Sequence, residues 1–448
     1  MDSQPTLLRE PSAAAPVAVE RPAVAGGVAA ALAASRWTQL GLGVAAMVTI
    51  CGPQYVWTLF TGSLTQALGA NLAQLQVTFS VLIVVQTFLS PAQGALIERF
   101  GPRVLLSIGT LVTGVSWMLA SQASSVWALY LSYGLLGGIG TGIVYIGVVG
   151  HMVRWFPDRR GLATGFVAAG YGMGALLFTF PVAESIRAVG HSATLLQFGA
   201  LFGLAGFLVA QGFRRPPAVV PGPPAASTLR LAAASHDFTP RQMLRTPIFW
   251  LLFVMMTMMS TSGLMVTSQM GAFTADFGMA NVLVLGMPLL PLALSLDRVT
   301  NGATRPFFGW VSDKVGREKT MFIAFSLEAA AMTVWLLTRD SPVLFVLMSG
   351  VVFFGWGEIF SLFPSTLTDT YGTAHATSNY GFLYMAQGIG SVLGGPMAAL
   401  LHQRMGSWIP VFALIIVMDA ATAVLAIAVL KPMRARWFQR LGATPVRT

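Results

Sequence analysis

Charged side chains are scarce in this chain of 448 residues: Asp, Glu, Lys and Arg make up only 9%, whereas hydrophobic residues make up 55%. A soluble globular chain carries about 25% charged residues, so a water-facing surface of ordinary size cannot be built here. This scarcity excludes a soluble enzyme, a nucleic-acid-binding protein and a disordered protein. The mean hydropathy of +0.71 and the 47 glycines predict an all-α polytopic membrane protein, because glycine lets helices pack closely in lipid.

Cysteine and clustered metal ligands are also lacking. The single cysteine, Cys51, excludes an internal disulfide and a cysteine-rich metal site. The five histidines are scattered along the sequence, and neither a nucleophile elbow nor a phosphate-binding loop is found. We therefore expect no enzyme activity, no cofactor, no metal site and no coupling to ATP.

Most of the sequence consists of long apolar stretches. A spanning helix needs about 20 mostly apolar residues, and the sequence offers twelve such stretches. The predicted spans lie near 38–60, 75–97, 104–121, 126–150, 161–182, 192–213, 248–270, 282–310, 320–338, 342–364, 380–401 and 407–430.

These spans divide the chain into two six-helix bundles, at 38–213 and 248–430. Between them, 214–247 is rich in proline and is predicted to be a cytoplasmic linker that cannot be helical throughout. We expect 1–37 to be a disordered cytoplasmic tail rather than a signal peptide, and 431–448 to be a basic cytoplasmic tail.

The positive charges indicate the orientation in the membrane. The net charge is +10, and with the N-terminus inside, the inner segments hold 21 basic residues and the outer loops hold 3. Cytoplasmic loops collect Lys and Arg, so both termini are predicted to be cytoplasmic. The same bias accounts for most of the net charge without a nucleic-acid partner.

A loop motif occurs twice, at equivalent places in the two halves. Each copy has a glycine, an adjacent acid and base, a second glycine and a nearby arginine, and the copies are 215 residues apart. This pair resembles the signature loop of the major facilitator superfamily, whose two halves rock about a site near the membrane midplane. We predict a gating latch at Gly94, Glu98, Arg99, Gly309, Asp313, Lys314 and Arg317.

Two arginines lie inside the eighth predicted span. A charge at mid-membrane costs roughly 2.5–3.5 kcal/mol, so each is a functional hypothesis. Arg298, Asn301 and Arg305 share one helix face by their spacing of three and seven. We predict that Arg305 binds substrate, because a guanidinium suits a carboxylate. Arg298 either contacts substrate or forms a structural ion pair with its neighbour Asp297.

Acids also occur inside spans. Glu358 in the tenth span could pair with Arg298 or titrate during transport. Glu328 and Asp419, in the ninth and twelfth spans, are interpreted as peripheral structural residues.

Aromatic and polar side chains recur in spans that should face a common cavity. Each polar tip needs a partner in hydrocarbon or a watery cavity. Together they describe an aromatic cage around a cationic centre, which predicts a small anion as substrate. The residues are Gln54, Tyr55, Tyr145, Tyr171, Trp356, Tyr380, Tyr384 and Gln387.

Several segments, among them 52–59, 154–165, 301–307 and 362–366, resemble the bacterial oxalate/formate antiporter family. The resemblance implies exchange of oxalate for formate by a multi-pass protein of the bacterial inner membrane, and we expect a monomer. It also implies that Arg305 is a carboxylate ligand. The same resemblance places Gln54, Tyr55, Tyr145, Tyr171, Trp356 and Tyr384 around the oxalate cavity.

The sequence departs from this family at three places. Gln387 stands where the best-known form has a second cationic ligand, a lysine, and Phe360 stands where a tyrosine is expected. Arg298 occupies a place that is usually uncharged. Either Arg298 supplies the second charge, or the substrate is a monoanion. The rival hypothesis is therefore a proton-coupled monocarboxylate symporter that uses Glu358 or Asp297 as its proton carrier.

Overall fold

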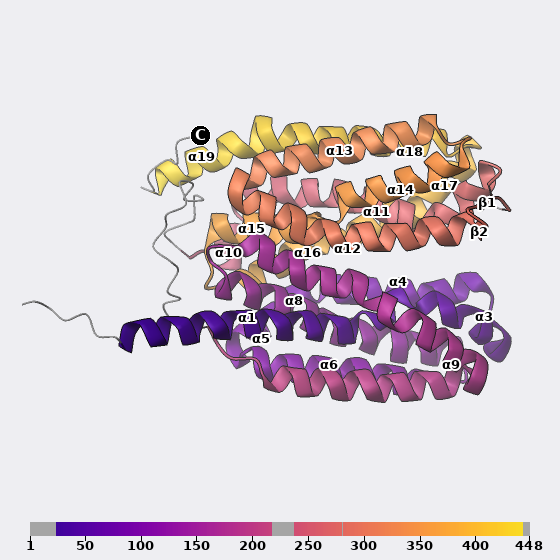
Figure 1. Ribbon diagram of the computed structural model, residues 1–448, viewed down its shortest axis with the longest axis horizontal. Helices are drawn as coiled ribbons and strands as arrows, with labels where there is room; N and C mark the ends of the chain where they lie inside the picture. The colour runs from indigo at the N-terminus through magenta and orange to yellow at the C-terminus, as the bar shows by residue number, and fades with distance from the viewer. Residues whose placement is uncertain (1–23, 217–236, 280, 442–448) are drawn as a thin grey trace, which may run out of the picture.

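The structure is a computed structural model that describes residues 24–216, 237–279 and 281–441. Its N-terminal half, indigo to magenta in Figure 1, is a helical bundle that lies below the C-terminal half. The N-terminal half contains α1 (Val24–Ile50), α2 (Gly52–Tyr55), α3 (Trp57–Leu68), α4 (Leu72–Phe88), α5 (Ser90–Phe100), α6 (Pro102–Ala120), α7 (Val126–Leu129), the π-helix η1 (Tyr130–Leu136), α8 (Gly137–Trp155) and α9 (Arg160–Gln211).

The C-terminal half, orange to yellow, repeats this helical architecture. Helices α12 and α16 carry most of its packing against α4, α5, α8 and α9 of the other half. It contains α10 (Pro240–Met243), α11 (Pro247–Asp276), the strands β1 (Leu283–Val284) and β2 (Met287–Pro288), α12 (Leu289–Val315), α13 (Arg317–Leu337), α14 (Pro342–Trp356), α15 (Ile359–Tyr371), α16 (Ala376–Val392), η2 (Leu393–Met397), α17 (Ala398–Met405), α18 (Ile409–Leu425), η3 (Ala426–Leu430) and α19 (Lys431–Arg440).

Among the described residues, seven helices are long and apolar enough to span a membrane, or eight if the pair α4 and α5, bent by 50°, forms one span. The long helix α9 counts once, although Gly190 breaks it with a φ of +83°. Only glycine adopts this conformation without strain, so the sequence allows a sharp reversal there. The count of twelve spans and the cytoplasmic termini stay predictions.

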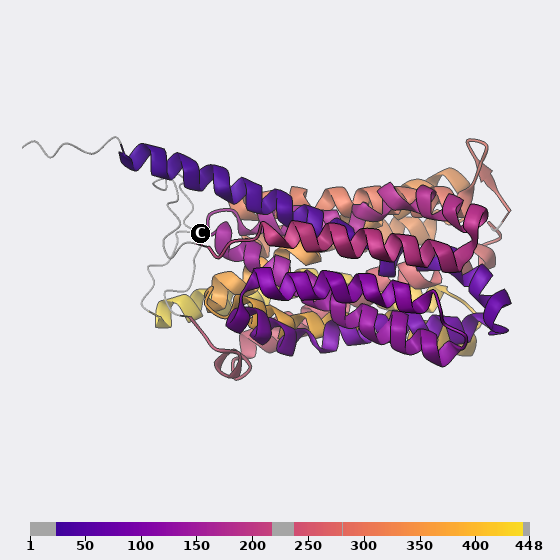
Figure 2. The same ribbon diagram turned by 90° about the horizontal axis from the view of Figure 1, so that it is seen from below.

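The structure differs from the predicted boundaries at two places. Helix α1 begins at Val24, so 24–37 is helical rather than part of a disordered tail, and 1–23 lies outside the described residues. The start of the predicted span 282–310 is the hairpin β1–β2 instead. Within the predicted basic tail, 431–440 forms the helix α19, and 442–448 lies outside the described residues. The place of this tail in the cytoplasm stays a prediction. Figure 2 shows that α1 extends beyond the bundle.

Glycines let helices of the two halves approach closely, as the glycine-rich composition predicts. Gly161 on α9 and Gly309 on α12 face each other across the two halves, and a Cβ on either would strike the backbone of the other. Gly165 likewise lies against the backbone of Arg305. Close contact between α9 and α12 therefore depends on these small residues.

Candidate functional site

Arg305 lies at the junction of the two halves and is 1% exposed. Its Nη1 donates to the backbone oxygen of Ala168 on α9 at 2.6 Å. Its Nε and Nη2 donate to Oδ1 of Asn301, one turn earlier on α12, at 3.1 and 2.8 Å. All of these partners are neutral, so the charge of the guanidinium is solvated by dipoles and not by a carboxylate.

Aromatic rings cover this guanidinium. Its carbon lies 4.5 Å from the centre of the Phe360 ring, a cation–π contact. The ring of Trp356 stands perpendicular to that of Phe360, with centroids 5.5 Å apart. A side chain at Gly172 would meet the guanidinium, so the glycine leaves space for it. Trp356 donates its indole N–H to the oxygen of Met259 at 2.7 Å, which fixes this wall of the site.

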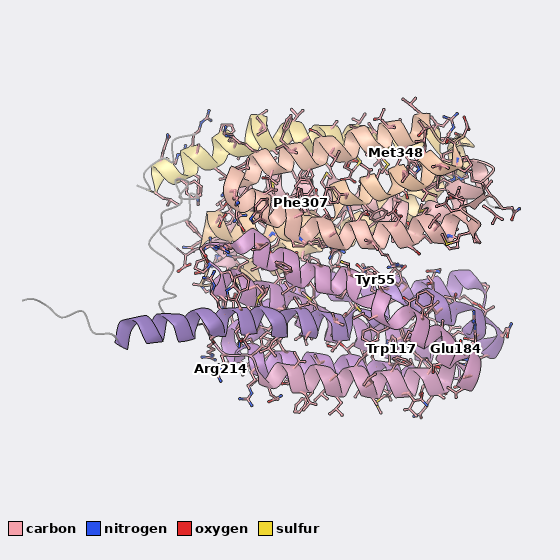
Figure 3. All side chains as sticks on the ribbon, viewed as in Figure 1. Tyr55, Trp117, Glu184, Arg214, Phe307 and Met348 are labelled. Carbon is pink, nitrogen blue, oxygen red and sulfur yellow. The ribbon has the colours of Figure 1, made fainter. Side chains whose placement is uncertain are left out.

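Tyrosines from both halves form a continuous cluster, as the aromatic pattern predicts. Tyr145 on α8 stacks on Tyr384 of α16, with centroids 4.8 Å apart. Tyr171 on α9 contacts both Tyr145 and Tyr55 edge-on, at 5.2 and 5.4 Å. Tyr380 continues the cluster from Tyr384 at 5.6 Å. Figure 3 labels Tyr55, which lies where the two halves meet.

Gln86 belongs to this cluster but was not predicted from the sequence. The hydroxyl of Tyr171 donates to Oε1 of Gln54 at 2.6 Å and accepts from Nε2 of Gln86 at 3.2 Å. Gln86 is a buried amide in an otherwise apolar stretch, and this was the available signal.

Three polar atoms of the cluster have no hydrogen-bond partner within the described part of the chain. They are the hydroxyls of Tyr145 and Tyr380 and Oε1 of Gln387, all buried. A buried polar group without a partner costs about 1–3 kcal/mol, so each is a place where a ligand atom would be stabilised. Tyr145 and Tyr380 also lie within electrostatic range of Arg305.

The structure does not show the ion pairs considered for Arg298. Its guanidinium carbon lies 5.1 Å from the centre of the Tyr55 ring, at the edge of the tyrosine cluster. Both carboxylate oxygens of Asp297 and of Glu358 are buried and, among the described residues, have no hydrogen-bond partner. Arg298 therefore lies beside the tyrosine cluster, and neither Asp297 nor Glu358 forms an ion pair with it among the described residues. Its roles in substrate contact or ion pairing stay predictions.

The remaining buried acids are not peripheral. Glu328 and Asp419 are both fully buried, and the hydroxyl of Ser262 connects them. Their interpretation as peripheral residues is wrong, because three helices of the C-terminal half enclose them.

The first copy of the loop motif joins the two halves. The Oε1 and Oε2 atoms of Glu98 accept from the amide and hydroxyl of Ser378, at 3.0 and 2.6 Å. Arg154 donates to Glu98 at 3.2 Å and to the backbone oxygens of Thr373 and Ala374 at 2.9 and 2.7 Å. The backbone of Gly94 packs tightly against that of Ser378.

The second copy does the same from the other half. Asp313 accepts from the amides of Gly161 and Leu162, the first turn of α9, at 3.0 and 2.9 Å. This places a carboxylate at a helix N-terminus, where the dipole stabilises it. Arg317 donates to Asp313 at 2.7 Å. We call the end of the bundle that carries both motifs the latch end.

Two predicted latch residues do not take part in these contacts. Arg99 is exposed and lies over Phe100, and Lys314 is exposed and lies over Trp310. They interact with rings on their own helices, because the acid of each motif already has partners in the opposite half.

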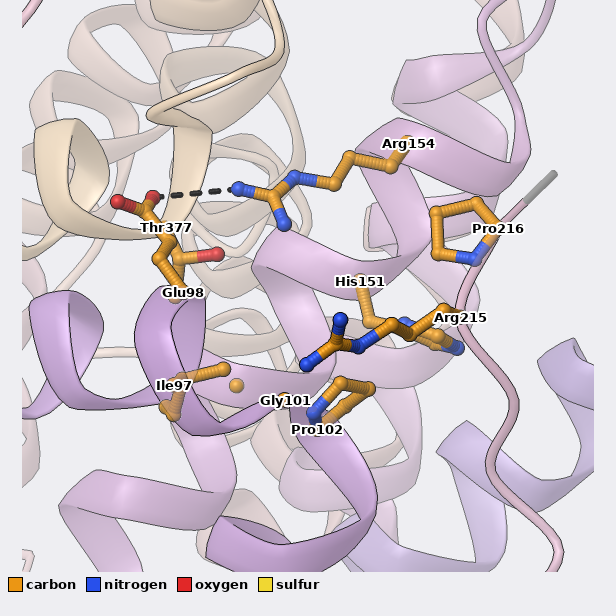
Figure 4. Close-up of a pocket in the computed structure, with 10 residues that line it drawn as sticks. Ile97, Glu98, Gly101, Pro102, His151, Arg154, Arg215, Pro216 and Thr377 are labelled. Carbon is orange, nitrogen blue, oxygen red and sulfur yellow. Dashed lines mark hydrogen bonds and ion pairs between the residues drawn. The ribbon is translucent and has the colours of Figure 1, made fainter. Parts of the chain in front are cut away.

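A cavity of about 250 Å³ lies beside the first motif. Figure 4 shows Arg154 bonded to Glu98 on one side and the side chain of Arg215 near Gly101 on the other. His151 also lines it, although its ring nitrogen already has a partner in Gln39. The cavity therefore borders the latch and not the tyrosine cluster.

Comparison with known proteins identifies the family. The sequence pattern of the Major Facilitator Superfamily matches residues 42–297 and 292–442. The oxalate:formate antiporter of Oxalobacter formigenes is 35% identical over 381 residues, which cover 85% of this chain and 88% of that protein. Monocarboxylate transporter 13 of Bos taurus is 27% identical over 338 residues, covering 73% of this chain and 74% of that protein.

Solved structures agree on the fold. The proton:xylose symporter XylE, bound to 6-bromo-6-deoxy-D-glucose, superimposes with a TM-score of 0.71 at 13% identity, covering 89% of this chain and 96% of that one. Such low identity supports the architecture alone. With two matching halves and a full-length relative, the chain belongs to the oxalate/formate antiporter family of the major facilitator superfamily, and it is a multi-pass secondary transporter and not an enzyme.

Proposed function

We propose that the chain exchanges small carboxylate anions by alternating access, with oxalate and formate as the exchanged pair. The observation that carries this proposal is Arg305, a buried cation at the junction of the halves whose hydrogen-bond partners are all neutral. A charge buried without a counter-ion is costly, and a bound carboxylate would offset that cost.

The surroundings of Arg305 favour a small anion over other substrates. Tyrosine rings and Phe360 exclude water, which strengthens the attraction between a guanidinium and a carboxylate. The unpartnered hydroxyls of Tyr145 and Tyr380 can donate to substrate oxygens. A cation would be repelled by Arg305, and a sugar would leave the charge of Arg305 unpaired.

The conformation supports alternating access. Both loop motifs connect the halves at the latch end, through Glu98 and Asp313. We propose that this end is cytoplasmic, in keeping with the bias of 21 inner against 3 outer basic residues. The state described is then closed toward the cytoplasm. We further propose that the chain spans the bacterial inner membrane twelve times, acts as a monomer, and uses the latch residues to close the cytoplasmic end.

Whether the site holds a dianion or a monoanion depends on the role of Arg298. A dianion such as oxalate is better held by two cations, and Gln387 is neutral where the family lysine is expected. Arg298 contacts the ring of Tyr55, and Tyr55 in turn contacts Tyr171 of the tyrosine cluster. We propose that Arg298 supplies the second charge when oxalate is bound.

The second candidate is a proton-coupled monocarboxylate symporter. Gln387 favours it, and so does the similarity to monocarboxylate transporter 13. Asp297 and Glu358 are the carboxyls that would carry the proton, since both are buried and neither forms an ion pair within the described part of the chain.

Counterflow in proteoliposomes tests both candidates. Formate-loaded vesicles at equal internal and external pH should accumulate labelled oxalate, whereas Arg305→Gln vesicles should not. Arg187→Gln is the matched control, because Arg187 is exposed and, among the residues that the structure describes, pairs with Glu184 one turn away. Uptake of a monocarboxylate that requires an imposed pH gradient, with oxalate ignored, would favour the symporter.

A further inference from the structure

Three buried side chains form a compact polar group inside the C-terminal half, apart from Arg305. Ser262 on α11 has its hydroxyl 2.8 Å from Oε1 of Glu328 on α13 and 2.9 Å from Oδ2 of Asp419 on α18. All three side chains are fully buried. We call this group the Ser262 trio.

The geometry of the trio requires a bound proton. A serine hydroxyl has one hydrogen and can donate to only one of the two carboxyl groups. The second short contact is a hydrogen bond only if the other carboxyl is protonated and donates to the serine oxygen. Two unprotonated carboxylates would also repel each other, and the net desolvation of each would cost several kcal/mol.

The trio is not a saturated structural network. Oε2 of Glu328 and Oδ1 of Asp419 are buried and, within the described residues, have no hydrogen-bond partner. Both carboxyl oxygens of Glu358 are also buried and, within the described residues, lack a hydrogen-bond partner. A negative charge on Glu358 would repel a negative charge on Glu328. A buried network that serves only stability has its members satisfied, and open acceptors leave positions for further protons.

The elements that hold the trio also form one wall of the substrate site. Gly263, next to Ser262 on α11, lies against the Trp356 indole so closely that no side chain would fit. Gly355 on α14 packs against the backbone of Glu328. A change in spacing between Glu328 and Asp419 would therefore displace the wall at Trp356.

The charged groups around the trio are few. Within the described chain, Glu328 is influenced by Asp419 and Glu358, and Glu358 is influenced in turn by Asp419 and Arg305. A carboxylate bound at Arg305 would offset the positive charge that Glu358 experiences. The charge of a bound substrate is thus linked through Glu358 to the protonation of Glu328 and Asp419.

We propose that Glu328 and Asp419, bridged by Ser262, form a proton-binding site whose occupancy keeps the Trp356 wall in place during transport. This function goes beyond the exchange of carboxylates and does not depend on which anion is carried. Loss of the proton creates two adjacent negative charges, separates α13 from α18 and slows exchange at alkaline pH.

Infrared spectroscopy of the purified full-length protein in lipid tests the site without substrate. Protonated carboxyl groups absorb separately from carboxylates, and their band shifts in heavy water. We expect a pH-dependent part of this band in the wild type to be missing in the Glu328→Gln Asp419→Asn variant. Identical titrations of the two proteins, or no such band in the wild type, would overturn the proposal.

The pH dependence of transport gives a second test, measured with equal pH on both sides of formate-loaded vesicles. Above its titration point the wild-type rate should fall about tenfold per pH unit, as occupancy of one proton site does. Glu328→Gln, which stays neutral and keeps the shape, should transport with a flat profile. Thr333→Val is the control on the same helix, because in the described part of the chain its hydroxyl donates to the backbone oxygen of Ala329, one turn earlier.

A wild-type profile in Glu328→Gln would contradict the proposal. If the double variant does not fold, Glu328→Gln and Asp419→Asn are each compared with the wild type in the same infrared titration, and a band unchanged in both would overturn the proposal. A wild type that shows the band but ignores oxalate would keep the proton site and reject the proposed exchange, so the two failures are distinguishable.

Discussion

Arg160 in the N-terminal half donates from Nη1 to Oδ1 of Asp369 in the C-terminal half at 2.5 Å. The other oxygen of Asp369 accepts from Nε of Arg317 at 2.8 Å. One buried carboxylate thus connects an arginine of each half at the latch end. Because Arg317 also binds Asp313, this network includes the second loop motif.

Asp369→Asn should open the latch end. Removing one partner from a buried ion pair costs about 3–5 kcal/mol. The part of this cost that comes from Arg160 falls on the closed state, because the pair of Asp369 with Arg317 lies within the C-terminal half. A cysteine placed at Thr377, which is 1% exposed, should then react faster with a maleimide. Asp340→Asn is the control, because Asp340 is an exposed acid. Equal rates of maleimide labelling in the two variants would show that Asp369 does not hold the latch end closed.

Gly309→Ala should prevent the same closure by steric means. The added methyl group would strike the Gly161 backbone, and overpacking of this kind costs about 1–3 kcal/mol. We expect a lower melting temperature and slower counterflow. Gly41→Ala is the matched control, since a methyl group there meets nothing within 4 Å. Similar counterflow rates in the two variants would show that α9 and α12 need not touch.

Tyr145→Phe should weaken anion binding without weakening the fold. Its hydroxyl lies near those of Tyr380 and Tyr384 but makes no hydrogen bond of standard geometry among the described residues. Removing it therefore mainly forfeits a bond to substrate, worth about 1.5–3 kcal/mol when the acceptor is charged. That loss raises the KM for oxalate roughly tenfold to a hundredfold.

Tyr133→Phe should behave in the opposite way, because the Tyr133 hydroxyl donates to the oxygen of Pro53 at 2.8 Å. It should lower the melting temperature and leave the KM unchanged. A Tyr145→Phe variant that loses stability and keeps its KM would contradict the assignment.

The second positive charge of the proposed oxalate site can be moved from position 298 to position 387 by mutation. Arg298→Gln should abolish oxalate exchange and retain exchange of formate, because a monoanion needs only Arg305. Adding Gln387→Lys to that variant should restore oxalate uptake from the other side of the cage. Counterflow with each anion measures both effects, and loss of formate exchange in Arg298→Gln would indicate that Arg298 has a structural role.

Much of the site follows from periodicity. The spacing of four places Asn301 beside Arg305 on one helix face, and their side chains are hydrogen-bonded. The spacing of four also brings Tyr380 and Tyr384 together. Both relationships are local to one helix, where sequence determines geometry.

Relationships between helices were harder to predict. Asp369 comes at the end of an apolar span, as many acids at the membrane interface do. Its pairing with Arg160 could not be predicted, because the tertiary fold brings the two residues together. Ser262 has no local feature that connects it to acids 66 and 157 residues away. The hairpin β1–β2 was missed because Val282, Leu283, Val284 and Leu285 read as the start of a span.

Equilibrium binding of labelled oxalate to the purified protein tests the central claim most directly, namely that Arg305 holds a carboxylate within the tyrosine cluster. We predict saturable binding that formate displaces and a neutral sugar does not, with Arg305→Gln binding at least tenfold more weakly, about 1.4 kcal/mol or more. Oxalate binding of wild-type affinity in Arg305→Gln would contradict the claim.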